Sequence, residues 1–525
     1  MKKIFILLFT QLALCCTSFA ANYLTFTAEE DNSAFSIEDH DINSNIFYSL
    51  DNGKTWNQLT DEPVGLAKGN RALLKGGKQD PKPSKENYSS FKMEGAIAAS
   101  GSVMSLVDGN GEGKTIPYDY CFCKLFENCS SLTKAPELLA TTLADCCYQN
   151  MFSGCTNLTQ APELPATTLA DLCYCEMFSK CTSLTKAPKL PATVLKHGCY
   201  GFMFSGCTSL TQAPKLPATT LTNNCYGFMF SGCTSLTQAP ELPATTLTYN
   251  CYGFMFSRCT SLTQAPELPA TTLADNCYNG MFSACSSLTQ APKLPATVLE
   301  YGCYQSMFSG CTSLTKAPEL PATTLANSCY DLMFNKCISL TKTPELPAKT
   351  LEEGCYNGMF YGCTSLTQAP NLPATTLTAG CYRYMFSGCT SLTKAPELPA
   401  KTLAGSCYYG MFDGCTSLTK TPKLPAKTLT ERCYYAMFNE CTSLTQAPAL
   451  PATTLAERCY QKMFNTCTKL SRIKVAFTDW GTGTDNWLTG VAGNGTFICP
   501  KKLPKKYGDD SIPEGWKIVN EDTSK

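Results

Sequence analysis

Apolar and polar positions recur along most of the chain with a period of 26 residues. One unit runs from Cys225 to Asn250, and fourteen copies of it carry a cysteine at the position of Cys233. Every copy also has phenylalanine at the position of Phe230 and leucine at that of Leu236. A unit this short cannot bury its apolar residues alone, so neighbouring copies must stack and share a continuous core. The pattern therefore predicts a repeat solenoid.

Within each unit the pattern predicts three short elements. Residues 236–239 favour a strand that Pro240 ends, since proline cannot donate a hydrogen bond to a β-ladder. Residues 225–230 favour one helical or 3-10 turn, and residues 243–246 the return to the next unit. If the strands stack about 4.8 Å apart, fourteen units make a rod or shallow arc of roughly 65 Å.

The recurring motif Met-Phe-x-x-Cys-Thr-x-Leu-Thr, with a proline after each predicted strand, resembles the BspA-like leucine-rich repeats of surface proteins in Gram-negative anaerobes. The resemblance covers about residues 117–473, and every copy carries it. Each unit is a few residues longer than the family's commonest length, around residues 240–243. The resemblance implies an extracellular leucine-rich-repeat solenoid, with adhesion or host-protein binding in some members, and no enzyme activity.

The repeats, residues 116–473, are preceded by a segment without them, residues 21–115, in which alternating stretches predict β structure. Ser49–Trp56 resembles the Asp-box hairpin of sialidases and several unrelated β proteins. Its predicted role is structural, because the aspartate can cap a glycine-containing turn and the tryptophan can pack beneath it. A sialidase would need several such boxes and an arginine cluster, whereas Arg71 is the only arginine before the repeats.

The pattern breaks again after the last repeat, and residues 474–525 are predicted to form a cap. A solenoid needs an atypical end to cover its last open core face. This segment holds Trp480, Trp487 and Trp516. Carbohydrate binding by these tryptophans is the alternative interpretation. The predicted fold is therefore a leucine-rich-repeat-like stack of short strands and helical or 3-10 turns, flanked by an N-terminal β domain and a small C-terminal cap.

Residues 1–20 have the form of a secretory signal peptide: two lysines, an apolar run, and small residues Ser18 and Ala20 before the cleavage site. Cys15 and Cys16 raise lipidation as the alternative. No later stretch approaches the roughly 20 apolar residues that span a bilayer. We therefore expect an exported protein, at the cell surface or extracellular, cleaved near Ala20.

The charges balance, with 42 Lys and Arg against 42 Asp and Glu, so no overall field favours nucleic acid or an anionic membrane. The 34 cysteines leave two interpretations open. Disulfides within each rung suit an exported protein, whereas cysteines at normally buried repeat positions suit free thiols that pack as small apolar groups. Zinc is disfavoured, because seven residues separate the paired cysteines and His40 and His197 are the only histidines.

No catalytic pattern is present, and we expect neither enzyme activity nor a cofactor or metal. A nucleophile needs a base within hydrogen-bond reach. His197 lies in a variable corner of a single unit, where a solvated loop residue is expected. The sequence contains no glycine-rich phosphate loop, no HExxH motif and no paired-carboxylate motif.

The variable positions of the repeat predict the contact surface. The position two residues after the fixed leucine is Lys or Gln, and stacking turns it into a column that we call the Gln/Lys ladder. Three residues further lies a second column, the Glu/Lys row. The candidate binding residues are Gln212, Gln238, Gln264, Gln290 and Lys316 of the ladder and Lys215, Glu241, Glu267, Lys293 and Glu319 of the row. The alternative is that both columns only keep the surface soluble and protect a sheet edge.

A second variable strip follows the repeated tyrosine and includes Phe202, Phe228 and Phe254. These rings are either exposed contact residues or part of the core. The function predicted from all these patterns is binding of another protein at the cell surface, of the adhesin or host-interaction type. The partner would be a host extracellular-matrix or surface protein. The alternative is a surface protein that binds a glycan through its end domains.

Overall fold

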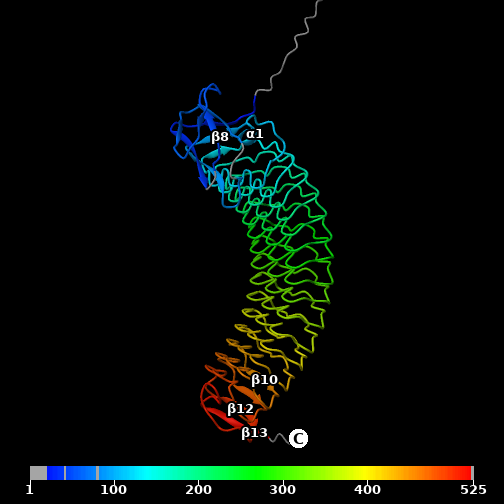
Figure 1. Ribbon diagram of the computed structural model, residues 1–525. Helices are drawn as coiled ribbons and strands as arrows, with labels where there is room; N and C mark the ends of the chain where they lie inside the picture. The colour runs from blue at the N-terminus through cyan, green and yellow to red at the C-terminus, as the bar shows by residue number, and fades with distance from the viewer. Residues whose placement is uncertain (1–20, 41–42, 78–81, 522–525) are drawn as a thin grey trace, which may run out of the picture.

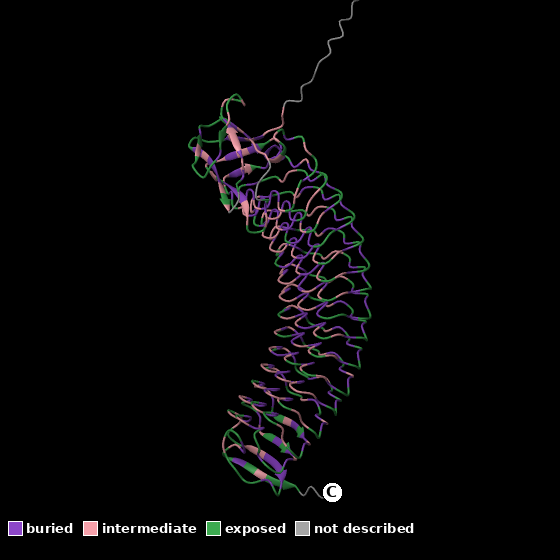
Figure 2. Cartoon of the chain, viewed as in Figure 1, coloured by how far each residue is buried: buried purple, intermediate pink, exposed green. Residues whose placement is uncertain are grey.

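The computed structural model describes residues 21–40, 43–77 and 82–521. The predicted signal peptide, residues 1–20, lies outside this part of the chain. The described residues form an N-terminal β domain, a long arc of stacked coils and a small C-terminal sheet (Figure 1). Buried residues run through the inside of the stack and exposed ones follow its margins (Figure 2). The predicted repeat solenoid is therefore confirmed. Across the described ranges, no helix is both long and apolar enough to cross a lipid bilayer.

The N-terminal β domain consists of two sheets joined by a shared core. The larger has the strand order β4-β3-β6-β1-β8-β9 and the smaller the order β5-β2-β7. The elements of this region are β1 (Leu24–Ala28), β2 (Ser33–His40), β3 (Phe47–Ser49), β4 (Asn57–Gln58), β5 (Val64–Leu66), β6 (Arg71–Lys75), β7 (Tyr88–Glu94), β8 (Ile97–Ser100), α1 (Ser105–Asp108) and β9 (Leu132–Lys134). The β structure expected from the alternating stretches is thus present.

The Asp-box-like hairpin has the structural role that its sequence predicts. The Asp51 carboxylate accepts hydrogen bonds from the Thr55 amide at 2.9 Å and the Thr55 hydroxyl at 2.7 Å. These bonds hold the pKa of Asp51 down, at about 2. The Gly53 amide donates to the Ser49 hydroxyl, and the Trp56 ring packs against Gly53. The hairpin is therefore a closed turn in which the Ser49 and Asp51 side chains bond to groups of the turn itself.

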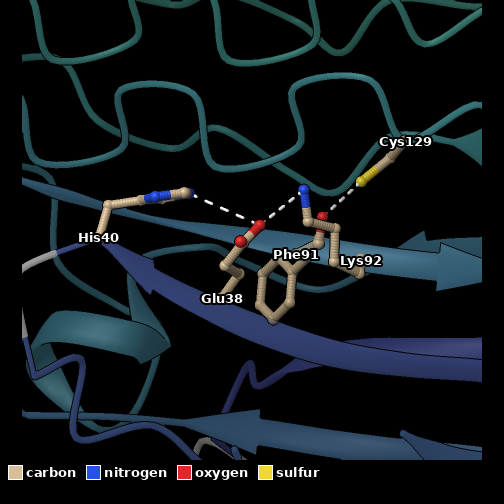
Figure 3. A network of polar contacts seen from close by, with 5 residues as sticks. All are labelled: Glu38, His40, Phe91, Lys92 and Cys129. Carbon is tan, nitrogen blue, oxygen red and sulfur yellow. Dashed lines mark hydrogen bonds and ion pairs between the residues drawn. The ribbon is translucent and has the colours of Figure 1, made fainter. Parts of the chain in front are cut away.

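The N-terminal β domain closes the first open face of the solenoid. β9 lies in the first rung and pairs in parallel with β8. The Cys129 thiol donates to the Phe91 carbonyl on β7 at 3.1 Å, and beside it Glu38 accepts from Lys92 at 2.8 Å (Figure 3). The Phe91 ring packs on Phe126 of the first rung at 5.1 Å. β7 thus supplies the ring and the carbonyl that a preceding rung would supply.

Each rung places the same side chains in the core. Tyr226, Met229, Phe230, Cys233 and Leu236 are all buried, and their equivalents in other rungs stack on them. Adjacent rings of the tyrosine and phenylalanine columns are nearly parallel, with centroids 5.9 Å and 5.7 Å apart in this part of the stack. Along these columns the step between rungs therefore exceeds the predicted 4.8 Å. Burial of each such side chain contributes about 1.5–3 kcal/mol.

The prediction of a helical or 3-10 turn over residues 225–230 is wrong. Asn224, Phe228 and Gly232 have positive φ angles of 57°, 57° and 75°, so every fourth residue is left-handed. A right-handed helix cannot pass through such residues. The segment is instead a chain of consecutive turns, in which the Met229 amide donates to the Tyr226 carbonyl at 3.2 Å.

These turns also bind neighbouring rungs together. The amide of Tyr226 donates to the Cys251 carbonyl of the next rung at 3.1 Å, and the amide of Phe228 donates to that of Gly253 at 2.8 Å. Amides of the intervening residues bond within their own rung. The bonds within the turns and the bonds between rungs together therefore pair the backbone amides and carbonyls that a helix would have paired internally.

The strand expected over residues 236–239 is shorter than predicted. In most rungs it is reduced to isolated parallel bridges such as Gln212↔Gln238. A second line of isolated bridges runs along the return segment, as at Thr246↔Thr272. Longer strands occur only toward the two ends of the stack, in β9 and in β10 (Gln446–Leu450). The proline two residues after Gln238 removes the amide that would extend the ladder.

The open question about the cysteines is answered in favour of thiols. All 32 described cysteines are free and buried. In the column of Cys233, each thiol donates to the phenylalanine carbonyl of the preceding rung, as from Cys233 to Phe204 at 3.1 Å. Burial raises the pKa of the Cys233 thiol to about 12 and that of Cys251 to about 11. The cysteines therefore pack as small apolar groups with one weak donor each.

The C-terminal sheet continues the stack. It consists of β10, β11 (Arg472–Val475), β12 (Gly495–Pro500) and β13 (Trp516–Glu521), all parallel and in that order. β11 crosses the predicted limit between residues 473 and 474. Trp487 stacks on Tyr460 of the last rung. The three indole nitrogens of Trp480, Trp487 and Trp516 donate to backbone carbonyls, and the rings are buried, so they offer no face to a sugar.

Candidate functional site

The candidate site is the surface formed by the Gln/Lys ladder and the Glu/Lys row. The chain alternates there between core and solvent: Leu236 and Leu242 are buried, whereas Gln238 and Glu241 between them are exposed. Stacking repeats this alternation in every rung. All ten residues singled out from the sequence are exposed: Gln212, Gln238, Gln264, Gln290, Lys316, Lys215, Glu241, Glu267, Lys293 and Glu319.

Backbone bridges keep the Gln/Lys ladder in register. Gln212 pairs with Gln238, and Gln264 pairs with Gln290, which in turn pairs with Lys316. Within the described residues, none of the ten side chains forms a hydrogen bond or ion pair with another protein group. The ladder therefore presents unpaired amides and ammonium groups at regular steps, each able to bond a partner.

The charge of the Gln/Lys ladder changes along the solenoid. The four positions from Gln212 to Gln290 are neutral amides, whereas Lys316 and Lys342 begin a part in which lysine predominates. The Glu/Lys row beside them mixes both signs. A partner lying along this surface would therefore meet hydrogen-bonding amides in its middle and mainly positive charge toward the C-terminal end.

Two hollows lie on this surface. One, of about 660 Å³, is lined by Gln290, Lys316, Lys293 and Glu319 together with the prolines and Leu294 between them. The other, of about 430 Å³, lies between Gln238 and Gln264. Both combine polar side chains with proline and alanine, so a partner side chain could bury apolar surface while bonding to the ladder.

The second variable strip is exposed in part. Phe202, Phe228 and Phe254 stack on one another with centroids 4.4 Å and 4.7 Å apart, outside the core columns. Phe202 is 38% exposed and the other two are half-buried. The stack ends where the Phe254 ring lies over Gly280, whose missing side chain makes the room.

A further hollow of about 460 Å³ was not predicted. It is lined by Arg383, Arg432, Arg458, Tyr409 and Tyr435 together with Ser406 and Gln461. A signal was available in the sequence, because these three arginines are half of the six in the chain. They stand at two different positions of the repeat, so a search of single columns misses their convergence.

His197 and the possible metal ligands are the remaining candidates for chemistry. His197 is exposed in its corner, and its amide donates to Asp171 at 3.0 Å. Over the part of the chain that the structure describes, no three or more His, Cys, Asp or Glu side chains converge on a possible metal position.

Comparison with known proteins supports the repeat assignment. The family model described as BspA type leucine rich repeat region matches residues 171–315, 241–367, 276–409 and 382–481, which together span more than half of the 525-residue chain. A solved structure described as the TLR13–ssRNA13 complex is 14% identical over 73% of this chain and about half (48%) of that chain, with a TM-score of 0.22. No curated protein matches the chain.

Proposed function

Because the chain belongs to the BspA-type leucine-rich-repeat family, we propose that it is an exported cell-surface protein whose Gln/Lys ladder binds another protein. Repeat solenoids of this kind provide long surfaces for binding other molecules. The partner we propose is a host extracellular-matrix or surface protein, in an adhesive or host-interaction role. Catalysis has no part in this proposal.

One observation carries the proposal: ten exposed side chains stand in register on one surface, and none is paired within the described chain. A surface that only maintained solubility would not require hollows between its rungs, such as the one around Gln290 and Lys316. Each rung would contribute a weak contact. Because the rungs are rigidly linked, such contacts act at high effective concentration, and many of them together give useful affinity.

The test begins with the partner captured by the mature chain, residues 21–525, from host secretions. We would compare wild type with Q212E/Q238E/Q264E/Q290E, which sets four like charges in a row and replaces amide donors by acceptors. We expect binding to fall at least about tenfold, since loss of one or two hydrogen bonds suffices for that change.

A matched control places the same four charges in the same rungs on the other bridge line, as T220E/T246E/T272E/V298E. These four positions are also exposed. The control should bind like wild type. If the glutamine variant also binds like wild type, or if both variants lose affinity equally, the Gln/Lys ladder is not the binding surface.

A further inference from the structure

The unpredicted hollow lies on a different surface, formed by the turn segments of the last four rungs. Arg432 and Arg458 occupy the position just before the first cysteine of their rungs. Arg383, Tyr409 and Tyr435 occupy the position two residues after that cysteine. The stack brings these two columns to the walls of one hollow of about 460 Å³.

These rungs depart from the rest of the solenoid. From Gly198 to Ser406, the nine positions of the arginine column before Arg432 hold glycine, serine or asparagine, such as Asn276, Ser328 and Gly380. Two repeat arginines lie outside the hollow, Arg258 and Arg472, and both are exposed on other parts of their rungs. Because the whole chain has no net charge, a cluster of three guanidinium groups is a local feature of this surface.

Aromatic rings position one of the guanidinium groups. The Arg383 guanidinium lies over the rings of Tyr409 at 4.9 Å and Tyr384 at 5.3 Å. It forms no ion pair within the described residues, so its charge is available to a ligand. Arg432 and Arg458 each contact the preceding glutamate, at 3.5 Å and 3.7 Å. Such exposed ion pairs are weak and can yield to a stronger partner.

Hydroxyl and amide groups complete the lining. The Tyr409 and Tyr435 rings stack at 4.4 Å. Burial raises the pKa of both hydroxyls, which therefore remain protonated hydrogen-bond donors at neutral pH. The Oε1 atom of Gln461 is buried without a hydrogen-bond partner. An acceptor at this point has no use within the protein and suits a ligand that brings its own donor.

The hollow continues along the solenoid. A neighbouring hollow of about 580 Å³ shares Arg383, Ser406 and Arg432 with it and reaches back to Tyr301. Its walls are largely glycine, serine and asparagine but also include Glu353 and Glu431, and Tyr301 is half-exposed at its far end. We therefore place the acidic groups of a ligand at the three arginines and not in this neighbouring hollow. The two hollows share three residues and together form a groove across several rungs. A groove of this kind suits an extended ligand such as a polymer.

We propose that this groove binds an acidic saccharide, with its carboxylate or sulfate groups on Arg383, Arg432 and Arg458. The planar guanidinium fork matches both acids through paired hydrogen bonds. Tyrosine and glutamine would bond the sugar hydroxyls. A peptide is disfavoured, because these walls offer few apolar pockets for its side chains. The proposal does not depend on the Gln/Lys ladder, which lies on another surface of the rungs.

The test measures binding of the mature chain, residues 21–525, to four polymers by surface plasmon resonance. Dextran sulfate and polygalacturonate carry the two acids, dextran is the neutral control, and poly-L-glutamate is the acidic peptide. We expect one or both acidic saccharides to bind and dextran to fail. The one that binds more tightly identifies the acid. R383Q/R432Q/R458Q should weaken that binding at least about tenfold, whereas R258Q should leave it unchanged.

Three results would overturn the proposal: neither acidic saccharide binds better than dextran, R258Q weakens binding as much as the triple variant, or poly-L-glutamate binds more tightly than both saccharides. If R383Q/R432Q/R458Q does not fold, the same binding measurement is made with R383K/R432K/R458K. This variant keeps the three positive charges and loses the planar guanidinium groups that form paired hydrogen bonds. Weaker binding by this variant supports the proposal, and unchanged binding contradicts it.

Discussion

At the scale of single residues, the second cysteine of each rung has two roles in the core. Its small side chain fills the space beside the phenylalanine column, and its thiol donates to the carbonyl of the preceding rung, as from Cys259 to Phe230 at 3.1 Å. A disulfide would remove this donor, and the Phe230 carbonyl would then accept only from the Cys233 amide of its own rung, at 3.0 Å. Both roles therefore favour the reduced form that the structure contains.

The thiols give the first prediction. The native chain, residues 21–525, should not react with a maleimide reagent at pH 8, because burial both blocks access to the thiols and raises their pKa, to about 12 for Cys285. After unfolding without reductant, all 32 described cysteines should react. Few reactive thiols after unfolding, restored by reductant, would instead indicate bridged rungs.

Two glycines give a matched prediction about the aromatic stack. Gly280 and Gly380 share a φ of 57°, where alanine costs about 1–2 kcal/mol. A side chain on Gly280 would also meet the Phe254 ring at 2.2 Å, whereas nothing lies near Gly380. Gly280→Ala should therefore lower the free energy of unfolding by roughly 1–3 kcal/mol more than Gly380→Ala does.

The control for this comparison is Phe254→Ala, which removes the ring. In the Phe254→Ala background, Gly280→Ala and Gly380→Ala should lower the free energy of unfolding, measured by chemical denaturation, by the same amount. A persistent difference would mean that the Phe254 ring does not lie over Gly280.

Among the elements, the β domain and the sheet at the two ends of the solenoid have the same structural role. The N-terminal β domain places Phe91 beneath the first rung, and the C-terminal sheet places Trp487 over the last tyrosine, Tyr460. Each end covers an apolar face that a further rung would otherwise cover. Solenoids generally require such ends for solubility.

Removal of residues 474–525 should therefore expose Tyr460 and its neighbours and cause association. The matched control removes residues 209–260, an equal length that takes out two whole rungs and keeps both ends. Analytical ultracentrifugation should find aggregates in the first variant and monomers in the second. Monomers in both would show that the last rung needs no cover.

The sequence predicts some of these elements better than others. The fixed phenylalanine and leucine positions predict the stacked core, because every copy repeats the same apolar spacing. The turn segment is predicted wrongly, because non-glycine residues such as Asn224 and Phe228 adopt left-handed angles. Their amides donate to carbonyls of the next rung, and a pattern within one unit does not contain those bonds. The Gln/Lys ladder is predictable as one column. The arginine hollow joins two columns, so it required the register of neighbouring rungs.

At the scale of the whole molecule, the buried thiols should make stability depend on pH. In the unfolded chain a thiol titrates near its ordinary value of 9.0, whereas in the folded chain burial raises the pKa, to about 11 for Cys251. Between these values the unfolded state loses protons that the folded state keeps. The contribution of the thiols to the free energy of unfolding is therefore complete below about pH 9. It is lost as the pH rises through the pKa of the thiols in the folded chain.

Because two cysteines recur in each of fourteen rungs, this loss should be steep. Thermal unfolding followed by circular dichroism should show Tm nearly constant from about pH 7 to 8.5 and falling strongly by about pH 10.5. Ultraviolet absorbance of thiolate should appear only on unfolding. A Tm that is constant up to about pH 10.5 would contradict the buried thiol columns.

If successive rungs of the Gln/Lys ladder act together on one protein partner, affinity should depend on the number of rungs. Removal of residues 209–260 takes out two ladder positions and removal of residues 209–312 takes out four, while both ends remain. With the captured partner, Kd should rise at each step, because each rung contributes a contact at high effective concentration. Equal Kd for wild type and both shortened chains would contradict joint action of the rungs.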